Sequence, residues 1–272
     1  MKRTLIVVVA LFAGALPAAV LGATTKSQKK TTTTTTAKVT TTTSSAPIGG
    51  TVVLGATSTP LRPPVCATKL CSIVLTRATA LETIRDGVTY PTTVKKAGQL
   101  VAFTVALAKI GKIVTPTGTE SAHDVIAGLD ARYGGTTRVA LTVLKGGKGT
   151  AGNRPWTVVA ESPIIHVQPY LGFVVQIPLT TPIQVTPGEV VALSVPTWAT
   201  VLSYDLNAKK FAYRQSRKTN CKYAGSFEDA QLTIGQTTTY KCDYAGTRVE
   251  YNATEVLAAP YPKNYVHSTR HP

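Results

Sequence analysis

The sequence contains few acidic residues and few of the side chains on which catalysis and metal binding depend. Only 13 of its 272 residues are Asp or Glu, against 29 Lys and Arg, and it has four histidines and four cysteines. Charged residues make up 15% and hydrophobic residues 43%, a balance that excludes a chain disordered throughout. The sequence also lacks a nucleophile elbow, a phosphate-binding loop and paired metal-ligand spacings. It therefore favours no catalytic class, and we predict neither a cofactor nor a metal.

The few candidate catalytic side chains are scattered. Two pairs of acids, Asp124 with Asp130 and Glu161 with Glu189, have the chemistry of a glycosidase. Any β-rich domain with this many acids contains such pairs, so a secreted hydrolase is only the third interpretation. His166 alternates with its neighbours as a strand residue does, and we interpret it as a packed or hydrogen-bonded side chain instead of a base.

The first 23 residues have the order of a secretory signal peptide. Lys2 and Arg3 precede an apolar run from Leu5 to Leu16, and Pro17 and small residues follow it. The alternative is an uncleaved anchor, because 19 residues from Leu5 onward carry no charge. We predict a secreted protein that acts outside the cell or in the cell envelope, with membrane contact only if the signal is not cleaved.

Residues 24–47 are rich in Thr, Lys and Ser and have almost nothing to bury. Ordering them costs conformational entropy without a compensating hydrophobic gain, so we predict a disordered linker. An O-glycosylated stalk and an unmodified spacer are both compatible with this composition. Residues 263–272 are predicted to be a flexible tail.

Residues 48–262 are predicted to form one all-β domain, a jelly-roll-like β-sandwich. Residues 99–109 show the period of a strand, with Val101, Phe103, Val105 and Leu107 on one side. The one helical signal is residues 121–135, where Ser121 and Asp124 form a capping box and Gly134 stops the helix after one or two turns. Further strands are predicted at residues 137–145, 156–162, 171–179, 188–196, 237–244 and 247–256.

The stretch from Thr137 to Trp198 contains "WTVVAESP" and "PLTTPIQVTPGEVVALSVPTW". This sequence pattern resembles that of jelly-roll modules of the carbohydrate-binding and galactose-binding-like kind, and also that of uncharacterised secreted β-sandwich proteins of actinobacteria. The resemblance implies a fold and a compartment, and it carries over no binding residue. We interpret Trp156 and Trp198 as core or rim anchors, with sugar platforms as the alternative.

The four cysteines are predicted to form disulfides, because an even number follows a signal peptide. Proximity along the chain favours Cys66 with Cys71 and Cys221 with Cys242 among three connectivities. The spacings fit no common zinc pattern.

The basic charge is not confined to the N-terminal segments. Of the formal charge of +16, +10 remains from Pro47 onward. A charge of this size favours anionic partners such as cell-wall polymer, acidic glycan or phospholipid. Secretion makes nucleic acid an unexpected partner.

A basic cluster interleaved with aromatic residues is the candidate binding surface. We considered a stacking and cation-π surface for anionic sugar, but favour a solvated strand edge on which lysines block unwanted pairing. Its members are Lys209, Lys210, Phe211, Tyr213, Arg214, Arg217, Lys218 and Lys222, with Tyr223 nearby.

The leading prediction is a secreted, non-catalytic β-sandwich module that binds carbohydrate or anionic wall polymer. The second is a purely structural or surface protein without a specific ligand. A concave strand face with exposed aromatic residues beside polar groups favours the first, a sealed convex sandwich favours the second, and two convergent carboxylates in a cleft favour the hydrolase.

Overall fold

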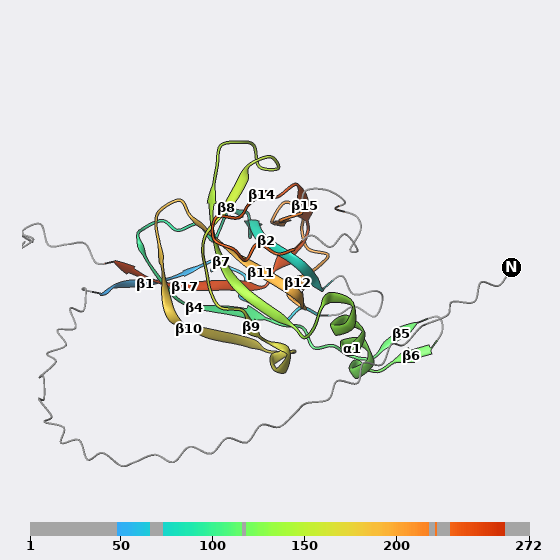
Figure 1. Ribbon diagram of the computed structural model, residues 1–272. Helices are drawn as coiled ribbons and strands as arrows, with labels where there is room; N and C mark the ends of the chain where they lie inside the picture. Colours follow the sequence, from blue (N-terminus) through green and yellow to red (C-terminus); the bar gives the residue numbers. More distant parts are fainter. Residues whose placement is uncertain (1–47, 66–72, 116–117, 218–220, 222–228, 259–272) are drawn as a thin grey trace, which may run out of the picture. The chain divides into compact units, whose positions relative to one another are not determined.

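The computed structural model describes residues 48–65, 73–115, 118–217, 221 and 229–258, all of which belong to one unit, Ser44–Pro272. These residues form antiparallel strands, one α-helix and one turn of 3-10 helix (Figure 1). The predicted all-β, sandwich-like fold is confirmed. The predicted signal peptide, linker and tail, and also Cys66 and Cys71, lie outside the described residues.

Two large antiparallel sheets organise the chain, and Figure 1 shows the smaller one as the layer that contains β4, β10 and β17. In spatial order its strands are β1 (Ile48–Leu54), β17 (Tyr251–Ala258), β4 (Gly98–Ala106) and β10 (Val174–Val185).

The larger sheet follows, in spatial order, β14 (Thr237–Thr239), β8 (Pro155–Glu161), β7 (Arg138–Gly146), β11 (Val190–Ala199), β2 (Leu75–Arg85), β13 (Phe211–Gln215) and β15 (Cys242–Ala245). Two short strands join it, β3 (Val88–Thr89) on β2 and β9 (Ile165–His166) on β7. Two separate pairs are β5 (Ile113–Thr115) with β6 (Gly118–Glu120) and β12 (Leu202–Ser203) with β16 (Arg248–Val249).

The main core lies between the two sheets. Leu141 and Val143 of β7 are fully buried in it together with Phe103 of β4, as the alternation of strand residues requires. Burying a side chain of this size contributes about 1.5–3 kcal/mol. The Tyr251 hydroxyl donates a 2.9 Å hydrogen bond to the carbonyl oxygen of Val191, which links the two layers across this core.

Strand β4 shows where simple alternation fails. The sequence predicted that Val101 shares a face with Phe103, but Leu100 is the fully buried residue and Val101 is only half-buried. The register of β4 against β17 shifts at this point, opposite Thr254 and Glu255. One additional residue in one strand reverses the direction of the side chains that precede it.

The outer face of the larger sheet is covered by residues 229–241. The hydroxyls of Thr79, Thr142 and Ser194 come from three adjacent strands, and Ser194 contacts both threonines at 2.6 Å. Ser194 also donates to the carbonyl oxygen of Gln231, whose N–H donates to Thr79 at 2.8 Å. This covering segment buries a second small core that contains Trp156, which is 2% exposed.

The helix α1 (Ala122–Tyr133) begins and ends as predicted. The Ser121 side chain accepts from the backbone of Asp124, whose carboxylate accepts from the Ser121 backbone, and Gly134 adopts the left-handed conformation at φ 84°. The predicted length was wrong, because the helix runs for 12 residues and not one or two turns.

Candidate functional site

Exposed apolar side chains occur in the connection between β8 and β10, which contains β9 and the 3-10 turn η1 (Gln168–Tyr170), and at the first residue of β10. Ile164 is 45% exposed, Tyr170 43%, Phe173 64% and Val174 47%. Single exposed apolar residues are ordinary, but several of them close together along the chain are a candidate interaction surface. We call these four residues the η1 surface; Figure 1 shows its turn as the short coil that precedes β10.

Backbone hydrogen bonds hold the η1 surface in place. The N–H of Phe173 donates to Tyr170 at 3.1 Å, and that of Tyr170 donates to Val167 at 3.0 Å. The turn is also joined to neighbouring segments, because Leu107 donates to Phe173 at 2.9 Å and Val167 donates to Thr137 at 3.0 Å. The two aromatic residues are therefore carried by a backbone that is ordered before any ligand arrives, which lowers the entropic cost of binding.

Cationic and polar groups border the η1 surface. The exposed Lys109 lies against Gly172, and Arg138 of β7 is the cross-strand partner of His166 of β9. The Nδ1 atom of His166 lies 3.0 Å from the hydroxyl of Thr136. His166 is thus hydrogen-bonded, as predicted, but it is exposed and not packed.

The predicted basic cluster does not form an exposed aromatic surface. Phe211 is 8% exposed, Tyr213 1% and Arg217 4%. The physical reason is the position of β13, which pairs with β2 on one side and with β15 on the other. The favoured interpretation of β13 as a solvated sheet edge is therefore also wrong, because both of its edges are hydrogen-bonded.

Among the described cations of that cluster, only Lys209 and Lys210 are exposed. Arg214 donates to the carbonyl oxygen of Tyr240 at 3.1 Å and to the Asp243 carboxylate at 2.7 Å, so its charge is used within the protein. Lys209 and Lys210 are exposed in the turn before β13. Two further predicted members, Lys218 and Lys222, lie outside the described residues.

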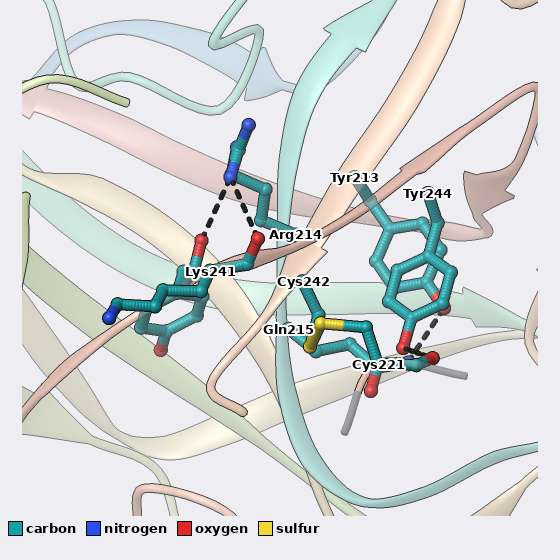
Figure 2. Close-up of a disulfide and its surroundings, with 8 residues drawn as sticks. Tyr213, Arg214, Gln215, Cys221, Lys241, Cys242 and Tyr244 are labelled. Atoms are coloured by element: carbon teal, nitrogen blue, oxygen red, sulfur yellow. Dashed lines mark hydrogen bonds between the residues drawn. A yellow bond between two sulfur atoms is a disulfide. The ribbon is translucent and has the colours of Figure 1, made fainter. Parts of the chain in front are cut away.

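The disulfide between Cys221 and Cys242 is present, as predicted, with a Cα–Cα distance of 5.1 Å. Figure 2 shows it beside the stacked rings of Tyr213 and Tyr244, whose centroids lie 5.0 Å apart. The Tyr244 hydroxyl donates to the carbonyl oxygen of Cys221 at 3.0 Å. Tyr213, considered as part of a surface for anionic sugar, instead stacks on Tyr244 beside this crosslink.

The candidate glycosidase acids serve local structure. Asp124 caps α1, and Asp130 of the same helix accepts a hydrogen bond from the Trp198 indole. Glu189 accepts from the backbone of the turn that precedes β11. Burial raises the pKa of the Glu161 carboxyl, which stands at the end of β8. Three of these four acids are therefore engaged in local contacts.

A fully buried ion pair on β2 was not anticipated from the sequence. Arg85 donates from Nε to the Glu82 carboxylate at 3.0 Å, and its other nitrogens donate to the carbonyl oxygens of Gly55 and Val249 and to the Asn252 side chain. Burial raises the pKa of the Glu82 carboxyl, against the opposing effect of the Arg85 guanidinium. This network joins the ends of both sheets and uses the donors of Arg85 on protein groups, so we assign it a structural role.

No protein-family model matches the chain, and comparison with curated proteins and with solved structures found no match. Within the described ranges, no three His, Cys, Asp or Glu residues are placed to hold a metal ion. No helix among the described residues is long and apolar enough to cross a membrane. The resemblance to secreted actinobacterial β-sandwich proteins therefore remains a prediction.

Proposed function

We propose that this chain is a secreted, non-catalytic binding module of the cell envelope or extracellular space, and that it binds glycan or wall polymer through the η1 surface. The observation that carries the proposal is the exposure of Tyr170 and Phe173 on a turn whose backbone is hydrogen-bonded to two neighbouring segments. The apolar face of a sugar ring packs against an aromatic ring, and an ordered turn supplies such rings without a folding cost.

The η1 surface also has the mixed character that a glycan requires. A sugar presents hydroxyl groups around an apolar face, so its binding surface needs hydrogen-bonding groups close to the rings. The exposed His166 lies two residues before the η1 turn. Gln176 is exposed on β10, two residues beyond Val174.

The test is a binding screen of the full chain against isolated cell walls and a panel of glycans. The variant Tyr170→Ala/Phe173→Ser removes both rings of the η1 surface. A matched control, Tyr204→Ala/Ile234→Ser, removes two side chains that are 62% and 64% exposed elsewhere. Surface substitutions usually change stability by no more than about 0.5 kcal/mol, so both variants should remain folded.

The proposal requires that the parent and the control bind alike and that the η1 variant loses at least about 90% of the binding. If the parent binds no wall or glycan, a purely structural role is favoured instead. If new reducing ends appear during incubation with a glycan, the protein is a hydrolase and the non-catalytic assignment is wrong.

A further inference from the structure

Lys109 lies beside the η1 surface because the segment that follows β4 is hydrogen-bonded to it. The segment after β4 pairs with the turn in both directions: Leu107 donates to Phe173 at 2.9 Å, and Gly172 donates back to Leu107 at 2.9 Å. Lys109 follows two residues later and is exposed. The backbone of Lys109 is thereby placed next to Gly172, the residue that precedes Phe173.

Gly172 permits this approach. Its φ is +94°, a conformation that residues with a side chain rarely adopt. A Cβ atom at this position would lie 3.2 Å from the Cβ of Lys109 and 3.7 Å from its Cα. The absence of a side chain therefore lets the backbone of the turn pack directly against Lys109.

The charge of Lys109 is available to a ligand. Among the described residues, no carboxylate lies within ion-pair distance of Lys109. Asp130, the acid that contacts η1 through Gln168, accepts its shorter hydrogen bond from the Trp198 indole. Arg138 is the cross-strand partner of His166 and is half-buried.

We infer that the η1 surface recognises acidic glycan in preference to neutral glycan, with Lys109 as the specificity-determining cation. This inference rests on the proposed function and names its ligand class. Sugar rings pack on Tyr170 and Phe173, while a carboxylate of the same polymer pairs with the Lys109 ammonium. The formal charge of +10 from Pro47 onward acts in the same direction by drawing an anionic polymer to the domain.

A phospholipid surface is the rival occupant, because exposed apolar residues beside a lysine also suit a membrane interface. The glycan is favoured by the polar, exposed His166 among the apolar residues. His166 and the exposed Pro169 lie between Ile164 and Phe173 and interrupt the continuous apolar face that insertion into lipid requires.

The experiment measures binding of the full chain to polygalacturonate and to its methyl-esterified form, which has the same sugar backbone without the charge. Lys109→Gln removes the cation, and Lys109→Arg restores it. Lys145→Gln is the charge-matched control. Lys145 is exposed on β7, seven residues beyond Arg138. At 3.3 Å per residue along a strand, Lys145 and Arg138 lie about 23 Å apart.

We expect the parent to bind the charged polymer at least about tenfold more tightly than the ester. Lys109→Gln should lose about fivefold in affinity for the charged polymer alone, as removal of one ion pair worth about 1 kcal/mol predicts. Lys109→Arg and Lys145→Gln should bind as the parent does.

Three results overturn the inference in different ways. If the parent binds both polymers equally and Lys109→Gln changes neither affinity, the selectivity for acidic glycan is refuted but the proposed function is not. An equal loss in Lys109→Gln and Lys145→Gln reduces the effect to general charge. Binding to vesicles of phosphatidylglycerol and phosphatidylcholine, with neither polymer bound, assigns the surface to lipid and contradicts the proposed function as well.

Discussion

The indole Nε1 of Trp198 donates a 2.8 Å hydrogen bond to Oδ1 of Asp130, so a fully buried residue of β11 holds a carboxylate of α1. The other oxygen of that carboxylate accepts from Gln168 of η1 at 3.4 Å. One acid thus connects the larger sheet, the helix and the turn that carries the η1 surface. The arrangement gives Trp198 the anchoring role predicted from its sequence context, and it gives Asp130 a structural role.

The substitution Trp198→Phe tests this connection. We expect it to lower the free energy of unfolding by about 1–3 kcal/mol beyond the loss of ring packing, because it leaves a half-buried carboxylate oxygen without its donor. Trp156→Phe is the matched control, since the Trp156 indole N–H has no hydrogen-bond partner among the described residues. Hydrogen exchange of the α1 amides should accelerate only in Trp198→Phe. Equal acceleration in both variants would contradict the anchoring role.

The second prediction is that the disulfide stabilises the folded protein. Replacing Cys221 and Cys242 by Ser frees a loop with a sequence separation of 21 residues, so unfolding should cost about 3 kcal/mol less by the loop-entropy relation. Urea denaturation of the double variant and of the parent without reductant measures this difference. Non-reducing peptide mapping is the accompanying check, and free thiols at Cys221 and Cys242 in protein purified without reductant would refute the crosslink.

Glu255 predicts a pH dependence. Glu255 lies opposite the bulge in β4, the residue is 1% exposed, and Oε1 has no hydrogen-bond partner in the described part of the chain. Burial raises the pKa of this carboxyl, so the folded protein disfavours the ionised form. The contribution of Glu255 to the free energy of unfolding is therefore fully present below the unfolded-state pKa of about 4.3. It is lost as the pH rises through the folded-state pKa.

The variant Glu255→Gln should consequently be more stable than the parent at pH 7, by about 1 kcal/mol, and equally stable near pH 3. Thermal and urea unfolding across this range give the comparison. Glu120→Gln, at an exposed residue of β6, changes the net charge equally and serves as the control. A Glu255→Gln variant that is less stable than the parent at pH 7 would show that the ionised carboxylate is stabilising.

The Thr-rich segment predicts a proteolytic boundary. Residues 24–47 have a composition that offers little to bury, whereas β1 begins at Ile48 and pairs with β17. Brief digestion should therefore remove the chain up to about Pro47 and leave a folded remainder, because exposed flexible segments are cut first. N-terminal sequencing of the product identifies the boundary. Protection of residues 24–47 would indicate that they dock on the domain.

Alternation of apolar residues predicted the strands that are buried on one face and bounded by turns, such as β7 and β11. It missed β2, which occupies the middle of the larger sheet. Both faces of β2 are covered, so apolar residues do not alternate with polar ones, and the charged residues Glu82 and Arg85 interrupt the apolar run. Their charges are compensated by each other and by backbone carbonyls from distant segments, which no local pattern reveals.

The candidate site, too, could not be predicted from local sequence patterns. The basic cluster was conspicuous in the sequence because its cations are close together along the chain. Pairing of β13 on both sides places Phe211 and Tyr213 inside, and that pairing depends on segments more than 100 residues earlier in the chain. Tyr170 and Phe173 were unremarkable in the sequence because part of their segment was predicted as strand. The strand β10 begins only at Val174, after Gly172 has turned the chain.

Hydroxyl-radical footprinting of the full chain, with and without bound wall polymer, tests the central claim most directly. The probe labels exposed aromatic rings, so Tyr170, Phe173 and Tyr204 all report from the free protein. We predict that polymer reduces labelling of Tyr170 and Phe173 by about fivefold and leaves Tyr204 unchanged. Protection of Tyr204 with continued labelling of Tyr170 and Phe173 would place the polymer elsewhere and contradict the assignment of the η1 surface.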